Sequence, residues 1–274
     1  MLELVLTTPD SVRVLPDAAE GHVQVWEEHG RICSYAYMAD GCPWIHVPDV
    51  ATFRIQGRDP DVLAIPESGA VDLIAEAFER HVLPMALQAL GHEVLHASAV
   101  LMPRGVVAFS GNSGSGKSTL AQAMTLRDYP AWADDAVMFE RAEGDEMRAL
   151  RLPFKINLRA DSASFLGLER LERQPVGSPA GASAPFAAIV FLARGRADSS
   201  TVAVRRLAST EAYKALLLQA YCFSLANEKR NARTAEKYLE LAAHVPTYEV
   251  SFAAGFERLG GLVERVEELV RECA

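Results

Sequence analysis

The sequence predicts an α/β protein with a small β-rich N-terminal region, a central α/β part and C-terminal helices. Three patterns support this fold class. Residues 1 to about 66 alternate apolar and polar positions in short runs, which is typical of half-buried strands. A continuous apolar run at 106–110 precedes a glycine-rich loop and a helix-forming segment, as in a sheet covered on both faces. Residues 210–272 follow mostly helical periodicity.

The composition indicates a folded chain. The 274 residues are 50% hydrophobic with a formal net charge of −9, and this length makes one large domain or two modest ones. No run approaches the roughly 18 apolar residues of a membrane span, so no membrane association is expected. The N-terminus lacks a basic leader and a cleavage site, which favours a cytoplasmic location. The acidic balance argues against nucleic acid as a partner, because phosphate contacts need clustered positive charge.

The first domain is predicted to cover residues 1–90 and to end in a helix. Asp40-Gly41 and several prolines punctuate its short strands. From Val71 the apolar period becomes that of a helix. Pro84 should kink or divide this helix, because proline has no backbone N–H to donate.

The second domain is predicted to cover residues 91–274. It begins with strands at 94–101 and 106–110, which a turn at 103–105 connects, and continues with a helix that runs through residue 126. Residues 141–149 are polar and are expected to form a hairpin tip. Further strands are predicted at 186–192 and about 202–207, and helices at about 210–227, 232–243 and 258–272.

Residues 111–118 match the motif G-x-x-x-x-G-K-[ST] in full, between a predicted strand and a predicted helix. The glycines allow backbone N–H groups to turn toward phosphate oxygens, and the helix N-terminus adds its positive dipole end. Lys117 is expected to reach the β- and γ-phosphates of ATP, and the Ser118 hydroxyl to bind Mg²⁺. The residues expected to line this nucleotide site are Gly111, Asn112, Ser113, Gly114, Ser115, Gly116, Lys117, Ser118 and Thr119.

Two adjacent carboxylates, Asp134 and Asp135, begin sixteen residues after Ser118. One can hold the metal, and the other can take a proton from an attacking hydroxyl. An Asp-Asp pair by itself is more often a solvated turn. Its place after a phosphate motif and one helix favours a catalytic role.

His96 and several basic residues are further candidates. Hairpin geometry would bring His96 toward the phosphate loop, where an imidazole can bind the γ-phosphoryl group or steer a proton; otherwise a histidine in a strand is structural. Lys155, expected to bind the nucleotide, and Arg159 are spaced to return near the loop and offset charge on the phosphoryl oxygens. A separate basic cluster is either a solvated loop or a contact for an acidic acceptor or ATP phosphates. Its members are Lys229, Arg230 and Arg233.

The segment 95–100, the loop 111–118 and Ala133-Asp134-Asp135 together resemble the catalytic domain of HPr kinase/phosphorylase. They are more similar to the stand-alone HPr-kinase-related proteins of bacterial biosynthetic clusters, some of which phosphorylate a serine of lasso-peptide precursors. The spacings from histidine to loop and from loop to double aspartate agree with that family's pattern over about residues 94–140.

The resemblance implies an ATP-dependent hydroxyl kinase whose P-loop domain is shared with phosphoenolpyruvate carboxykinase. Lys117 and Ser118 would bind phosphate and Mg²⁺. Asp134 and Asp135 would divide metal binding and general-base catalysis, with Asp135 preferred as the base, and His96 would assist at the transferred phosphoryl group.

The chain also departs from the family. HPr kinases have an aspartate at the position of Asn112 and a Ser-Glu pair at the position of Ser118-Thr119, and their later glycine-rich signature is not found here. These departures argue against HPr as the substrate and against the reverse phosphorolysis. They favour another hydroxyl acceptor.

The function expected from these observations is transfer of the γ-phosphoryl group of ATP to a hydroxyl, preferably a serine, of a peptide, protein or small molecule. Two alternatives remain: a P-loop ATPase, and a non-catalytic nucleotide-dependent peptide-binding or sensor module. The strand at 186–192 ends in Ala193-Arg194 rather than an acidic residue, which argues against the ATPase. Residues 1–70 are expected to support acceptor recognition or to pack as a cap. The resemblance also allows a homo-oligomer, because relatives often assemble.

Overall fold

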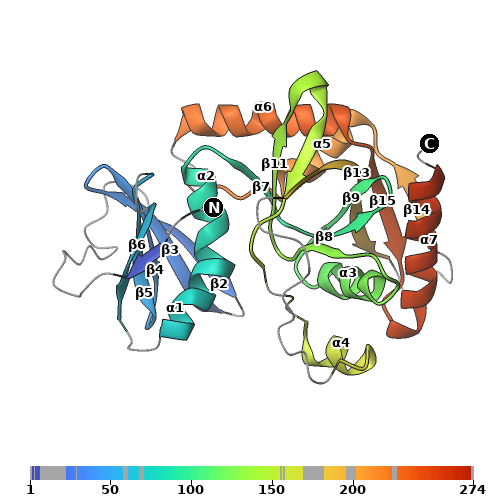
Figure 1. The fold of residues 1–274 in the computed structure, drawn as a ribbon, viewed down its shortest axis with the longest axis horizontal. Helices are drawn as coiled ribbons and strands as arrows, with labels where there is room; N and C mark the ends of the chain where they lie inside the picture. Colours follow the sequence, from blue (N-terminus) through green and yellow to red (C-terminus); the bar gives the residue numbers. More distant parts are fainter. Residues whose placement is uncertain are drawn as a thin grey trace. The chain divides into compact units, whose positions relative to one another are not determined.

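The computed structural model describes residues 2, 4–6, 23–28, 30–57, 61–67, 71–154, 156, 158–168, 182–195, 202–223 and 227–272. They form a mixed α/β structure with two sheets (Figure 1). The first of two compact units combines Met1–Glu93 with Tyr221–Arg233, and the second combines Val94–Ala220 with Thr234–Ala274. The sequence-based boundary at residue 90 did not include the return of residues 221–233 to the first unit. No helix within the described ranges is long and apolar enough to cross a membrane.

The described residues of the first unit form a six-stranded sheet. Its strands are β1 (Leu4–Leu6), β2 (Gln24–Glu28), β3 (Arg31–Ala39), β4 (Cys42–Val47), β5 (Ala51–Ile55) and β6 (Val62–Pro66). They lie in the order β1-β6-β5-β4-β3-β2, with β1 parallel to β6 and the other pairs antiparallel. Asp40 and Gly41 close the β3–β4 hairpin with φ values of 51° and 65°, as a two-residue hairpin turn requires.

The predicted helix of the first unit is divided, as the position of Pro84 indicated. A π-helical turn at Phe78–Val82 separates α1 (Val71–Ala77) from α2 (Leu83–Ala89), and Pro84 lies in the first turn of α2. Proline is tolerated there because the N–H groups of a first helical turn have no intrahelical acceptor. The segment 221–233 joins this unit through side-chain contacts: the Phe223 N–H donates to Gln88 Oε1 over 2.9 Å.

The described residues of the second unit contribute nine strands. These are β7 (Glu93–Leu95), β8 (Ala97–Met102), β9 (Gly105–Ser110), β10 (Ala131–Ala133), β11 (Val137–Arg141), β12 (Met147–Leu150), β13 (Ser183–Arg194), β14 (Ala203–Arg206) and β15 (Thr247–Phe252). The C-terminal half of β13 runs parallel to β9 on one side and to β15 on the other. Its first residues pair with β12, which forms the predicted hairpin with β11. β8 lies between β9 and β10 and is antiparallel to both.

Helices cover both faces of this sheet, which explains the continuous apolar run of β9. Val107 and Phe109 pack with α3 (Lys117–Thr125) and α7 (Leu259–Glu272) on one face. Val106 and Ala108 pack on the other face with residues of α5 (Ser209–Leu217) and of α6 (Glu228–His244). A short helix, α4 (Ala160–Phe165), lies beyond the end of β12 along the chain. Figure 1 shows α3 and α7 side by side on their face.

The structure corrects three sequence-based expectations. The strand predicted at 94–101 is broken at His96, whose backbone N–H donates to the carbonyl of Gln219 rather than to a neighbouring strand. The helix predicted at 210–227 ends at Leu217, and Ala220 forms an isolated β-bridge with Leu95. The interpretation of the C-terminal part as mostly helical missed β15, a strand that pairs with β13 and β14.

Candidate functional site

The glycine-rich loop connects β9 to the N-terminus of α3, as its motif predicts. Gly111 has a φ of 135°, and a Cβ atom at this position would lie 2.9 Å from the carbonyl oxygen of Leu192 on β13. The close approach of the two backbones therefore requires glycine. Gly116 is the N-cap of α3 with a φ of 105°, a left-handed conformation that favours glycine. The loop consequently presents the N-terminus of a nine-residue helix directly beyond β9.

Lys117 is folded back over the loop. Its ammonium group donates to the carbonyl oxygen of Gly111 over 3.0 Å, and the side chain is only 7% exposed. Burial lowers the pKa of Lys117, and the negative charges of Asp135 and Asp134 oppose that shift. The Ser115 hydroxyl is also buried in the loop, where it has no hydrogen-bond partner among the described residues. A buried hydroxyl and an ammonium group held by backbone carbonyls both suit phosphate oxygens, so these residues fit a nucleotide tail.

Asp134 reaches the loop through one intervening side chain. Ser98, at the second position of β8, donates its hydroxyl proton to Asp134 Oδ1 over 2.7 Å. The same Ser98 oxygen lies 3.4 Å from the hydroxyl oxygen of Ser118. The antiparallel pairing of β10 with β8 brings Asp134 to this position, because Asp134 directly follows β10. The two predicted metal ligands thus share one contact.

Asp135 occupies the turn between β10 and β11 in a left-handed conformation, with a φ of 63°. The N–H of Ala136 closes this turn by donating to the carbonyl oxygen of Asp134 over 2.9 Å. Aspartate tolerates such a φ better than most residues, although the conformation still costs roughly 1 kcal/mol or more. The negative charge of Asp135 raises the pKa values of both Lys117 and His96. The carboxylate therefore lies within electrostatic range of the phosphate loop and of His96, where the strand is broken.

His96 is held as a neutral imidazole. Burial and the positive charge of Lys117 lower its pKa to about 4, while Asp135 and a side-chain hydrogen bond with Gln219 partly oppose the shift. Its own carbonyl oxygen accepts the Ser110 hydroxyl over 3.0 Å at the end of β9. At neutral pH this side chain can therefore accept or donate a hydrogen bond without adding positive charge.

The other predicted nucleotide-binding residues differ in their placement. Thr119 turns toward α4, where its hydroxyl lies 3.0 Å from that of Ser162. The guanidinium of Arg159 lies over the loop, with Nη2 3.5 Å from where a Cβ of Gly114 would stand. Asn112 and Ser113 are exposed, and Lys155 lies outside the described residues.

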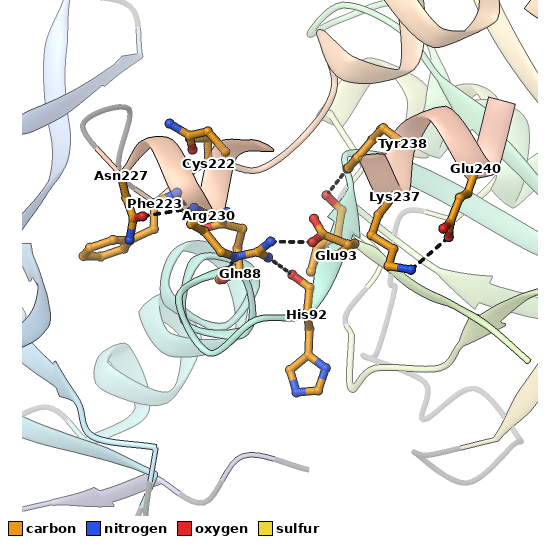
Figure 2. A network of polar contacts seen from close by, with 12 residues as sticks. Gln88, His92, Glu93, Cys222, Phe223, Asn227, Arg230, Lys237, Tyr238 and Glu240 are labelled. Carbon is orange, nitrogen blue, oxygen red and sulfur yellow. Dashed lines mark hydrogen bonds and ion pairs between the residues drawn. The ribbon is translucent and has the colours of Figure 1, made fainter. Parts of the chain in front are cut away.

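The basic cluster at the start of α6 is not one functional group. Arg230 is largely buried in the first unit, where it pairs with Glu93 and donates to the carbonyl oxygens of Gln88 and His92 (Figure 2). Lys229 and Arg233 are exposed on the same helix. The sequence-based interpretation of these residues as a loop is wrong, because all three belong to α6.

Ser98 and Gln219 belong to no motif of the sequence, and no role was predicted for them. Ser98 had no signal of its own, because a serine in a strand is common and its contacts depend on how β8 and β10 pair. Gln219 follows the end of α5, and nothing in the sequence placed it beside His96.

A metal site at Ser118 and Asp134 would have few protein ligands. Within the described ranges, no three His, Cys, Asp or Glu side chains gather closely enough to form a metal cage. Mg²⁺ usually keeps several waters and binds through one or two protein ligands plus phosphate oxygens. A hydroxyl and a carboxylate beside a phosphate loop fit that pattern.

Comparisons with known proteins identify no family for this chain. No family model matches the sequence, and no curated protein is similar to it. Among solved structures, the chain resembles the Hpr(Ser) kinase/phosphatase from Coxiella burnetii with a TM-score of 0.35 and 14% identity, over 65% of this chain and 94% of that chain.

Proposed function

We propose that the protein is an ATP-dependent phosphotransferase that moves the γ-phosphoryl group to a hydroxyl, preferably a serine, of a peptide, protein or small molecule. The observation that carries the proposal is that Ser98 links Asp134 to Ser118 at the end of the phosphate loop. Ser98 links the Asp134 carboxylate to the Ser118 hydroxyl by contacts of 2.7 and 3.4 Å. A glycine-rich turn without a ligand would have no need of a buried carboxylate at that point.

The loop side of the site would bind ATP. Lys117, the Ser115 hydroxyl and the loop amides would donate hydrogen bonds to the phosphate oxygens. Arg159, which lies over Gly114, would offset the negative charge that develops during transfer. Ser118 and Asp134 would hold Mg²⁺, which neutralises charge on the triphosphate when it is bound.

The acceptor side would use Asp135 as the general base. As the acceptor oxygen attacks the γ-phosphorus, Asp135 takes the hydroxyl proton, and the bond between the γ-phosphorus and the bridging oxygen breaks to release ADP. The neutral His96 imidazole, close to both Lys117 and Asp135, would donate a hydrogen bond to the phosphoryl group or orient the acceptor.

The acceptor itself is part of the proposal. Asn112 and Thr119 differ from the HPr kinase pattern, and Thr119 turns away to α4, which favours an acceptor other than HPr. We propose that the first unit supports acceptor recognition or acts as a cap.

The experiment is a transfer assay with γ-³²P-labelled ATP and Mg²⁺. The panel contains serine and threonine peptides, free serine, simple alcohols and cell proteins. Label on any hydroxyl acceptor supports the kinase. Label released only as free phosphate would indicate an ATPase, and binding of ATP without either product would indicate a sensor module. Either of those results would overturn the proposal.

A further inference from the structure

Ser98 is a fully buried hydroxyl on a strand with a neighbour on each side, and the two side-chain contacts that it makes among the described residues are both with proposed metal ligands. The side chain is 0% exposed, on a strand flanked by β9 and β10. Two other buried hydroxyls of this unit have backbone acceptors: Ser110 donates to the carbonyl oxygen of His96, and Thr247 donates to that of Val245. Satisfying a buried hydroxyl therefore does not require the contacts that Ser98 makes.

Counting protons gives these contacts a direction. An ionised carboxylate only accepts hydrogen bonds, so the 2.7 Å contact uses the single proton of Ser98. The Ser98 oxygen can then only accept, and the 3.4 Å contact to Ser118 must use the Ser118 proton. The direction of the chain is thus Ser118 to Ser98 to Asp134.

This direction prepares both ligands. Because the Ser118 proton points toward Ser98, the lone pairs of the Ser118 oxygen are turned elsewhere, and a metal ion binds through lone pairs. Because Asp134 accepts the Ser98 hydrogen bond at Oδ1, the orientation of its carboxylate group is fixed. The second carboxylate oxygen, Oδ2, takes no part in this hydrogen bond.

We infer that Ser98 is a positioning residue that orients Ser118 and Asp134 as a pair of Mg²⁺ ligands. The inference rests on the proposed function, since it concerns the metal site of the same nucleotide pocket. Residues that orient metal ligands commonly change metal affinity by about 10- to 100-fold when they are replaced.

The test measures metal affinity directly. Mn²⁺ serves as the probe, and its dissociation constant for the protein with a non-hydrolysable ATP analogue is measured by electron paramagnetic resonance. Ser98→Ala and Ser98→Cys should raise this constant by about tenfold or more, while binding of the analogue in EDTA stays near wild type. Ser98→Thr keeps the hydroxyl and should restore most of the Mn²⁺ affinity.

Thr247→Val is the matched control, because it removes another buried hydroxyl of the same sheet that contacts only a backbone carbonyl. It should lower thermal stability without changing the Mn²⁺ dissociation constant.

Wild-type Mn²⁺ affinity in Ser98→Ala or Ser98→Cys would overturn the inference, as would an equal loss of Mn²⁺ affinity in Thr247→Val. If the unmodified protein binds Mn²⁺ with nucleotide but transfers no phosphoryl group, the proposed function fails while this inference stands. If it binds no Mn²⁺ with nucleotide, both are contradicted.

Discussion

His96 and Lys117 show how burial sets the charge of the site residue by residue. Both side chains are bases whose protonated forms are positively charged, and burial is the largest cause of the lowered pKa in each. Lys117 has two carboxylates nearby to retain its charge, whereas His96 faces Lys117 itself. The site therefore holds one neutral imidazole beside one ammonium group.

The neutral state of His96 predicts a pH dependence of stability. The folded-state pKa is about 4 and the unfolded value is 6.5, so between these values only the unfolded chain binds the proton. Stability is then lost as the pH falls through this window, by about 2 kcal/mol at pH 5. His96→Gln should lose less stability than wild type between pH 7 and pH 5 in urea titrations.

His92→Gln provides the matched control, because it is the same substitution at an exposed histidine. Equal curves for wild type and His96→Gln would show that His96 is not buried as a neutral group.

Arg159 is the exposed cation whose position predicts a direct effect on nucleotide binding. Its guanidinium lies over Gly114 within the phosphate loop, and a hydrogen bond to a charged group contributes about 1.5–3 kcal/mol. Arg159→Ala should therefore raise the dissociation constant of Mg-ATP by about tenfold or more, and Arg159→Lys by less. Isothermal titration calorimetry measures both. An unchanged constant in Arg159→Ala would remove this residue from the site.

At the scale of elements, the pairing of β8 with β10 creates the site. Ser98 on β8 and Asp134 after β10 are far apart in sequence, and they meet because the two strands are antiparallel neighbours. The phosphate loop needs no such pairing, since strand, loop and helix follow one another along the chain. Site residues of the loop could therefore be predicted from the motif, whereas Ser98 and Gln219 depend on contacts between distant segments.

The start of α6 makes a separate prediction about stability. Arg230 pairs with Glu93, which is 6% exposed, so removing the guanidinium leaves a buried carboxylate without that partner. Arg230→Ala should destabilise the protein by about 3–5 kcal/mol. The double variant Arg230→Met with Glu93→Leu should recover much of that loss, because it removes both charges.

Chemical denaturation measures these changes, with Lys229→Ala as the control at an exposed neighbouring position. Lys229→Ala should change stability by no more than about 0.5 kcal/mol. A cost for Arg230→Ala as small as that of Lys229→Ala would contradict the structural role of this ion pair.

At the scale of the whole molecule, features that depend on neighbouring residues in the sequence could be predicted, whereas features that depend on contacts between distant segments could not. The α/β class and the division of the first helix near Pro84 followed from periodicity and proline chemistry. β15 was missed because its six residues lie between two strongly helical segments, although Thr247, Tyr248 and Val250 are strand-favouring residues. The return of residues 221–233 to the first unit depends on tertiary contacts such as the bond between Phe223 and Gln88.

The proposed chemistry resides in one of the two units. The site residues from His96 to Asp135, together with Arg159 and Gln219, belong to the second unit. The first unit is available for a role other than phosphoryl transfer, which agrees with the proposal that it concerns the acceptor.

The most direct measurement is phosphoryl transfer by Asp135→Asn with the acceptor identified in the labelled-ATP assay. Asparagine tolerates the positive φ of this turn, so the variant removes the base without changing the backbone. Asp128→Asn is the matched control, being the same substitution at an exposed turn residue with a φ of 67°. We predict that Asp135→Asn lowers the transfer rate at least about 100-fold with little change in Mg-ATP affinity, while Asp128→Asn transfers at the wild-type rate. Transfer by Asp135→Asn near the wild-type rate would contradict the assignment of Asp135 as the base.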